Sequence, residues 1–193
     1  MLERKNNRLR AFDYARPGTY FITTVVKGRR NTFGNIENGT IRLTAYGTIL
    51  VGQWYWLHNQ YPNIALDEFV VMPNHFHGII NIVGTGCDLS LHPATSTRPN
   101  PKSLSELVGA FKTTTSKQIH RLGMSSFQWQ RSFYDRIVRN EDELNRIREY
   151  IRTNPLRWEL DIENGTRIMG KADRRQVPER DHIQRYYDGI IRP

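Results

Sequence analysis

The chain has almost no cysteine: Cys87 is the only one among its 193 residues. A single thiol excludes an internal disulfide framework and a zinc site built from several cysteines. No apolar run approaches the roughly 18 residues of a membrane-spanning helix. The start at Met1 is basic and polar rather than a secretory signal. These absences predict a soluble cytoplasmic protein of one domain, which is long enough to bury a core.

Several catalytic motifs are also missing. The sequence has no Walker phosphate loop, no glycine-rich dinucleotide turn, no His-Glu-x-x-His zinc motif and no serine nucleophile elbow. The short stretch Gly84-Thr85-Gly86 resembles a linker more than a phosphate-binding loop. These omissions argue against nucleotide-dependent enzymes, zinc proteases of that motif and serine hydrolases.

What the chain does have is positive charge. It contains 28 Lys and Arg against 19 Asp and Glu, for a formal net charge of +9 and an isoelectric point of about 9.9. Such a balance favours polyanionic partners, nucleic acid above all. Charge alone also fits a merely soluble basic protein, so residue patterns have to decide.

The first half of the chain alternates β-rich and helical segments. Residues 18–26 and the apolar runs 64–72 and 76–83 are predicted strands. Residues 31–43 are a predicted hairpin, with Glu37-Asn38-Gly39 as its turn. Residues 44–59 carry apolar side chains at helical spacing.

The second half continues the pattern. Ser103 and Glu106 have the spacing of a capping box before an apolar helical stripe. Residues 127–138 are predicted to form one long strand. Asn140 is predicted to cap a third helix, with Glu143 at the reciprocal position, and Asn154-Pro155 is predicted to end or kink it.

This order of elements predicts an α+β fold. We expect a ferredoxin-like βαββαβ antiparallel sheet with helices on one face, plus an N-terminal hairpin region, a C-terminal helix and a basic tail. The expected organisation is a basic N-terminal arm (1–17), a catalytic domain (18–160) with a flexible linker inside it (84–101), and an Arg-rich tail (161–193).

The sharpest local motif is the pair His75 and His77, which flank Phe76 at the start of a predicted strand. Alternate strand residues point to the same face, so both imidazoles can converge on one divalent metal while Phe76 points into the core. Imidazole suits several divalent metals. The alternative is that two histidines simply lie on a solvated strand face, and a third ligand is needed to decide.

The third helix offers that ligand. Tyr150 and Asn154 are four residues apart and therefore share one helix face. The amide oxygen of Asn154 can complete a metal site, which would leave the Tyr150 phenol beside the metal as a covalent nucleophile. The alternative for Tyr150 is a half-buried core aromatic between Ile147 and Ile151.

Arginine is concentrated around Tyr150, and Arg suits bidentate phosphate contacts. The candidate nucleic-acid-binding residues are Arg131, Arg136, Arg139, Arg146, Arg148, Arg152, Arg157 and Trp129. Neighbouring aromatic residues, Trp129 among them, can stack on unpaired bases. Taken singly, these residues also fit a solvated charged face and a packed core.

Two segments together resemble a known family. Met72-Pro73-Asn74-His75-Phe76-His77 resembles the His-hydrophobic-His motif of HUH single-strand endonucleases. The segments 134–140 and 150–155 resemble the REP-associated tyrosine transposases (RayT-like). The match runs from about residue 17 to residue 158, without the linker 84–101, and the long linker and Arg-rich tail depart from it.

The resemblance implies a ferredoxin-like fold and an Mg²⁺ or Mn²⁺ ion held by His75, His77 and Asn154. It implies that Tyr150 is the nucleophile that takes a 5′-phosphotyrosine link and leaves a free 3′-OH. It further implies a transposase that cuts and joins single-stranded DNA at hairpins formed by palindromic repeats, as a monomer or a homodimer. The alternatives are a domesticated protein that binds structured DNA or RNA without cutting it, and a metal-dependent nuclease that uses water.

Overall fold

A computed structural model describes residues 16–83 and 102–158. At its centre lies one antiparallel sheet of four strands: β1 (Gly18–Val25), β4 (Ile64–Val71), β5 (His75–Ile82) and β6 (Tyr134–Val138). Their order across the sheet is β4-β5-β1-β6. Helix α1 (Ala45–Gln60) connects β1 to β4, and α2 (Leu104–Arg121) precedes β6. The predicted ferredoxin-like βαββαβ arrangement is therefore confirmed.

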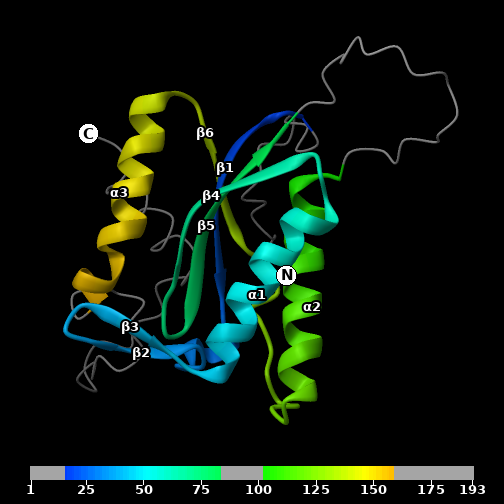
Figure 1. The fold of residues 1–193 in the computed structure, drawn as a ribbon, viewed down its shortest axis with the longest axis vertical. Coiled ribbons are helices and arrows are strands. Elements are labelled where there is room, and N and C mark those ends of the chain that lie inside the picture. The colour runs from blue at the N-terminus through cyan, green and yellow to red at the C-terminus, as the bar shows by residue number, and fades with distance from the viewer. Residues whose placement is uncertain (1–15, 84–101, 159–193) are drawn as a thin grey trace, which may run out of the picture.

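The three helices divide between the two faces of the sheet (Figure 1). Helices α1 and α2 pack side by side on one face, as predicted for the helices of the βαββαβ unit. The C-terminal helix α3 (Glu141–Arg157) covers the opposite face and contacts β4 and β6. Helix α3 therefore buries side chains on the second face of the sheet.

The larger core lies between the sheet and the helices α1 and α2. Strand β5 gives this core Phe76 and Ile80, and it gives the α3 face His75, His77 and Ile79. This alternation follows from the two-residue repeat of a strand. The glycine at 78 belongs to the core face, where an added Cβ would collide with the rings of Trp54 and Phe76.

The connection from β1 to α1 contains η1 (Lys27–Arg29) and the hairpin of β2 (Gly34–Glu37) and β3 (Thr40–Leu43). Asn38 and Gly39 both have positive φ, at 53° and 71°. Two such residues between paired strands are typical of a type I′ turn, so the predicted hairpin turn is confirmed.

Helix caps follow the sequence closely. The Ser103 side chain accepts from the Glu106 N–H and Glu106 returns the bond, so the predicted capping box is present. Asn140 caps α3 by accepting from the Glu143 N–H at 2.8 Å. The carboxylate of Glu143 reaches one residue further back than expected and accepts from the Arg139 N–H at 2.9 Å.

Two predicted boundaries are wrong. Residues 127–133 are not part of a long strand; only Trp129 forms an isolated bridge, to Val26, and β6 begins at Tyr134. The Lys112 ammonium donates to the carbonyl oxygens of Gln130, Arg131 and Ser132, which diverts these backbone acceptors from strand pairing.

The second wrong boundary is the end of α3. The helix continues through Pro155 to Arg157 instead of ending at Asn154-Pro155. Proline lacks only one donor, and so close to the helix end the loss is tolerated. The alternative of a kink at that point stays a prediction.

The linker 84–101, the tail 161–193 and nearly all of the arm 1–17 lie outside the described residues, as does a short helix expected near 185–190. The division into domains therefore stays a prediction. No helix among residues 16–83 and 102–158 is long and apolar enough to cross a membrane.

Candidate active site

Two imidazoles meet at the start of β5, on the face that α3 covers. The Nε2 atoms of His75 and His77 lie 3.0 Å apart, and both side chains are fully buried. Phe76 between them points into the opposite core, as predicted. The strand geometry thus brings the two expected ligands together.

Asn74 fixes the orientation of His75. Its Oδ1 lies 2.8 Å from His75 Nδ1, and its Nδ2 donates to the Arg29 carbonyl at 3.2 Å. An amide oxygen only accepts, so the proton of the neutral His75 ring lies on Nδ1. Its Nε2 therefore presents a lone pair toward His77.

Thr23 orients His77. The threonine Oγ1 lies 2.8 Å from His77 Nδ1, directly across the β1–β5 pairing. A hydroxyl both donates and accepts, so it can partner either tautomer of the ring. With the His77 proton on Nδ1, both Nε2 lone pairs face the same point, as two ligands of one ion require.

Both histidines are neutral at physiological pH. Burial holds the pKa of His75 well below its usual range, with the nearby Arg29 charge as a second cause. Burial does the same to the pKa of His77, assisted by His75. Neutral imidazole is the form that binds a metal.

Helix α3 places Tyr150 against this pair. The phenol oxygen lies 3.4 Å from His77 Nε2, and only 2% of the residue is exposed. Phe21 of β1 supports both rings: it stacks on His77 with centroids 5.5 Å apart and meets Tyr150 edge-on at 6.2 Å. The predicted nucleophile and the two predicted histidine ligands therefore meet in one buried cluster of side chains.

Asn154 lies one turn further along α3, on the same buried face as Tyr150. It is 1% exposed, and its Oδ1 has no hydrogen-bond partner within the described part of the chain. A buried polar atom left unsatisfied costs about 1–3 kcal/mol, so such atoms call for an explanation. A cation held by this oxygen would supply one.

The separation of the two imidazole nitrogens fits a small divalent ion. Adjacent ligands of an octahedral ion at about 2.1 Å lie about 3.0 Å apart, which is the separation of the two Nε2 atoms. Within residues 16–83 and 102–158, no three His, Cys, Asp or Glu side chains gather into a metal-binding group. A site made of two imidazoles and an amide oxygen would leave coordination positions open for water or substrate.

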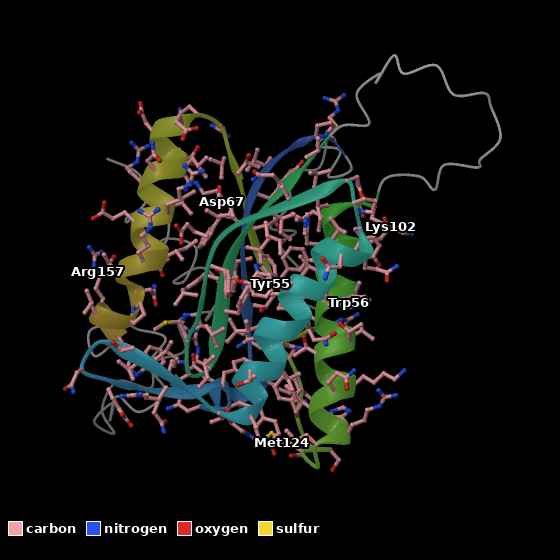
Figure 2. All side chains as sticks on the ribbon, in the orientation of Figure 1. Tyr55, Trp56, Asp67, Lys102, Met124 and Arg157 are labelled. Atoms are coloured by element: carbon pink, nitrogen blue, oxygen red, sulfur yellow. The ribbon has the colours of Figure 1, made fainter. Side chains whose placement is uncertain are left out.

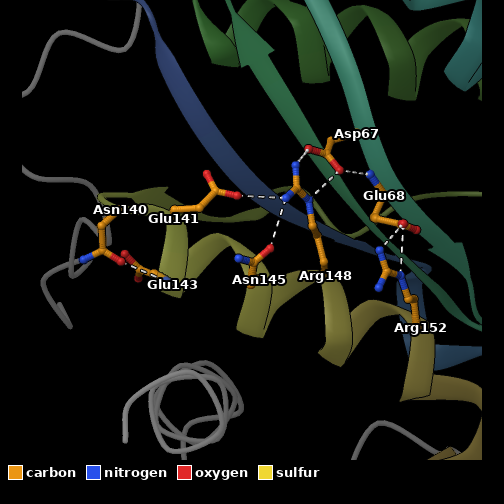
Figure 3. Close-up of polar contacts among 8 residues, drawn as sticks. All are labelled: Asp67, Glu68, Asn140, Glu141, Glu143, Asn145, Arg148 and Arg152. Carbon is orange, nitrogen blue, oxygen red and sulfur yellow. Dashed lines mark hydrogen bonds and ion pairs between the residues drawn. The ribbon is translucent and has the colours of Figure 1, made fainter.

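Ion pairs fasten α3 to the edge strand β4 (Figure 3). Arg148 binds both carboxylate oxygens of Asp67, at 3.1 and 2.7 Å, and Arg152 binds Glu68 at 2.8 Å. β4 has one extra residue between Leu66 and Phe69 relative to β5. That bulge lets two consecutive acidic side chains reach α3 while Phe69 returns to the core face.

The predicted nucleic-acid-binding residues divide into exposed side chains and side chains held by other residues. Arg131, Arg139, Arg146 and Arg157 are exposed, while Arg136 pairs with Glu143 at 2.6 Å. Arg148 and Arg152 are held by the acidic residues of β4. Trp129 is half-buried, and its indole N–H donates to the Lys112 carbonyl. Whether any of them contacts nucleic acid stays a prediction.

Three contributors to the site were missed from the sequence. Asn74 is part of the motif at 72–77, but the sequence predicts no role for it, and Thr23 is predicted only as a strand residue. Asp67 was not singled out at all. Asn74 directly precedes His75, which is a signal that could have been used. Thr23 becomes visible only once the register of β1 on β5 is known.

Comparison with known proteins finds a relative in sequence and solved structures that are similar in fold. No protein-family model matches the chain. The chain is 34% identical over 165 residues to an uncharacterized protein of Haemophilus influenzae, covering 82% of this chain and 91% of that protein. The structure of a REP-associated tyrosine transposase bound to a REP hairpin matches with a TM-score of 0.53 at 21% identity, over 81% of this chain and 74% of that one. The chain thus belongs to the family of the Haemophilus influenzae protein and has the fold of the REP-associated tyrosine transposase.

Proposed function

We propose that this protein is a metal-dependent transposase that cuts and joins single-stranded DNA at hairpins or palindromic repeats. Tyr150 would act through a covalent 5′-phosphotyrosine intermediate. The observation that carries the proposal is the Tyr150 phenol oxygen 3.4 Å from a buried imidazole pair. A buried core tyrosine needs one hydrogen-bond partner, which His77 alone would supply. The second buried imidazole, 3.0 Å from the first, is the part that a packing role leaves unexplained.

The residues at the site have distinct roles in this proposal. His75, His77 and Asn154 would hold an Mg²⁺ or Mn²⁺ ion, and the unpartnered Oδ1 of Asn154 supports its inclusion. When bound, the ion polarises the scissile phosphodiester and neutralises its charge. Asn74 and Thr23 keep the imidazole rings oriented through their Nδ1 atoms.

The chemical step is a transfer between two oxygen atoms. The Tyr150 oxygen attacks the phosphorus, the bond from phosphorus to the 3′ oxygen breaks, and the phenol proton ends on that 3′ oxygen. The 5′ phosphate stays on the protein as a phosphotyrosine. A 3′-OH on another strand then reverses the step, so strands are joined without hydrolysis of a nucleotide.

DNA as the substrate rests on charge and on the fold. The net charge of +9 favours a polyanion. The transposase with the similar fold is described as bound to a REP hairpin. Because Tyr150 and both histidines are buried, a phosphodiester reaches them only after some part of the protein moves aside.

The direct test uses Tyr150→Phe with labelled single-stranded DNA that folds into a hairpin, in the presence of Mn²⁺. The wild-type protein should form an adduct that survives SDS, and the variant should form none while still binding the hairpin. An adduct of unchanged yield with the variant would reject Tyr150 as the nucleophile, and Tyr134 would then be the next candidate. EDTA should prevent the adduct in the wild type.

The same experiment separates the two alternatives. A non-catalytic binding protein would bind the hairpin equally with and without Mn²⁺ and would leave the strand intact. A nuclease that uses water would cut the strand yet leave no protein on the 5′ end. Either result in the wild-type protein would overturn the proposal.

A further inference from the structure

A basic groove lies on the helix α2 side of the molecule, away from Tyr150. It consists of three adjoining hollows of about 880, 470 and 420 Å³, all of which are lined by Gln128. One wall is formed by the last three turns of α2, and another by the segment 127–131. The segment 27–30 after β1 closes the far end. We call the whole the basic groove.

The charge of the basic groove has one sign. Its cationic lining residues are Lys27, Arg30, Lys112, Lys117, Arg121 and Arg131. None of the described residues that line it is Asp or Glu. The chain has 19 acidic residues, and two of them form ion pairs with Arg148 and Arg152 on α3. The groove has no such pairs among its described lining residues. A concave surface without a carboxylate is suited to an anionic ligand.

The exposed cations are spread over all three hollows. Lys117 and Arg121 are four residues apart on α2, so they lie on one helix face about 6 Å apart along its axis. Arg131 lines the first hollow with them and the second with Lys27, and Lys27 lines the third with Arg30. Both α2 residues are exposed. Cations spread over adjoining hollows suit a chain of phosphates better than a single anion.

The floor of the groove is held firmly. Lys112 is partly buried, which lowers its pKa to about 8, and its ammonium donates to the Gln130 carbonyl at 2.7 Å. Trp129 donates to the Lys112 carbonyl and packs against Phe33 and Phe127. Lys112 and Trp129 therefore fix the shape of the groove, while the exposed cations remain for a ligand.

The aromatic content distinguishes between two forms of DNA. Binding sites for single strands need exposed aromatic faces on which bases stack. Here Phe127 is buried, and Trp129 and Tyr134, which also line the groove, are half-buried; Trp129 packs against Phe33 and Phe127. The rings are thus only partly accessible, whereas Lys27, Lys117 and Arg121 are exposed and suit contacts to a sugar–phosphate backbone.

The basic groove also connects with the catalytic end of the sheet. Lys27 follows β1 two residues after Val25, which pairs with His75. Asn74, which orients His75, donates to the carbonyl of Arg29 in the same 27–30 segment. A nucleic acid bound in the groove would therefore leave it near the end of strands β1 and β5 where the imidazoles lie.

From these observations we infer that the basic groove binds the backbone of the base-paired stem of a DNA hairpin, with Lys117 and Arg121 as phosphate ligands. This inference rests on the proposed function and adds to it the place where the folded part of the substrate is held. The active site would then receive the strand that leaves the stem.

The test compares two double variants in the Tyr150→Phe background, so that only binding is measured. Lys117→Gln with Arg121→Gln removes two charges from the groove. The control, Arg16→Gln with Lys102→Gln, removes two exposed charges at the opposite end of the sheet; Lys102 and Met124 mark the two ends of α2 in Figure 2. Dissociation constants for a fluorescent DNA hairpin are measured from about 50 to about 200 mM NaCl.

Each lost phosphate contact should reduce the slope of log K against log salt by about 0.9. The groove variant should therefore lose about two units of slope and at least about tenfold in affinity near physiological salt, with an unchanged melting temperature. The control should lose much less. Equal loss in the two variants would overturn the inference, because overall charge would then explain the binding.

A second oligonucleotide identifies the form of DNA. It has the same base composition with one arm scrambled, so that no stem forms. The groove variant should bind this strand nearly as well as the Tyr150→Phe parent does. A loss equal to that for the hairpin would assign the groove to single strands and reject the stem. Adduct formation is not measured here, so failure of the groove and failure of the Tyr150 chemistry remain distinguishable.

Discussion

The two faces of the central sheet differ in what they bury. The face under α1 and α2 buries large apolar side chains, with Trp54, Phe76 and Phe111 fully enclosed. The face under α3 buries Thr23, two histidines and Asn154 within a much smaller apolar cluster. Burying polar groups is costly unless they are paired. On the α3 face Thr23 and both histidines are paired with one another or with Asn74, and the Asn154 oxygen is the described exception. Strand β5 serves both faces by alternating its side chains.

The largest expected effect follows from removing the imidazoles on the α3 face. His75→Ala with His77→Ala should lower the rate of adduct formation by about a thousandfold, because the metal's stabilisation of charge is worth several kcal/mol. The adduct is measured on SDS gels with labelled hairpin and Mn²⁺. Circular dichroism must show a folded protein, and His77→Ala alone is the substitute if the double variant does not fold. A wild-type rate of adduct formation in a folded variant would contradict the assignment of the chemistry to the α3 face.

The opposite face should respond in stability instead. Trp54→Ala should lower the free energy of unfolding by about 3–5 kcal/mol, since it opens a large cavity in the core. Denaturant titration measures this change. At a temperature where the variant is folded, its adduct rate per folded molecule should stay within a few-fold of wild type. A large specific loss of chemistry would show that the two faces are not separable.

Two neighbouring threonines give a sharper comparison. Thr23→Val removes the hydroxyl beside His77 and should reduce Mn²⁺ affinity about 10–100-fold, because ligand orientation depends on that bond. Thr24→Val is the matched control on the core face: the hydroxyl of Thr24 is buried without a partner in the described structure. Calorimetric titration should find its affinity unchanged and its stability equal or higher. Equal losses in both would argue that Thr23 has no specific role.

The smallest effect concerns the ion pair that fastens α3. The Arg148 guanidinium holds the pKa of Asp67 below its ordinary value of 3.8. A lowered carboxyl pKa adds stability that is present at neutral pH and disappears as pH falls below about 4. Asp67→Asn should cost about 1–2 kcal/mol at pH 7, and the difference from wild type should shrink as pH falls below about 4.

Urea unfolding at several pH values measures this convergence. Glu37→Gln is the control, because Glu37 forms only an exposed pair with Arg42 at 3.4 Å. A difference between Asp67→Asn and wild type that stays constant from pH 7 to pH 2 would assign the loss to packing and not to charge.

The fold could be anticipated because its signals are local. The Asn38-Gly39 turn, the capping box at Ser103 and the cap at Asn140 are each contained in a few residues. The segment before β6 could not be anticipated. Phe127 and Trp129 alternate as strand residues do, yet they pack into the core while Lys112 takes the backbone carbonyls beside them.

The site was anticipated in part for the same reason. The spacing of His75 and His77, and of Tyr150 and Asn154, lies within one strand and one helix. Contacts that cross between elements, such as Thr23 to His77 or Arg148 to Asp67, depend on register and bulge positions that no local pattern encodes. The sequence therefore indicated the chemical groups but not the residues that hold them in place.

The bulge in β4 has a consequence for assembly. β4 is an outer strand, and an outer strand normally presents free backbone groups to which a strand of another molecule can pair. The extra residue interrupts the regular spacing of those groups, and the adjacent carboxylates, tied to α3, add charge at the same place. Extension of the sheet by a second subunit is thus disfavoured along this edge, while the other outer strand, β6, shows no bulge in its pairing with β1.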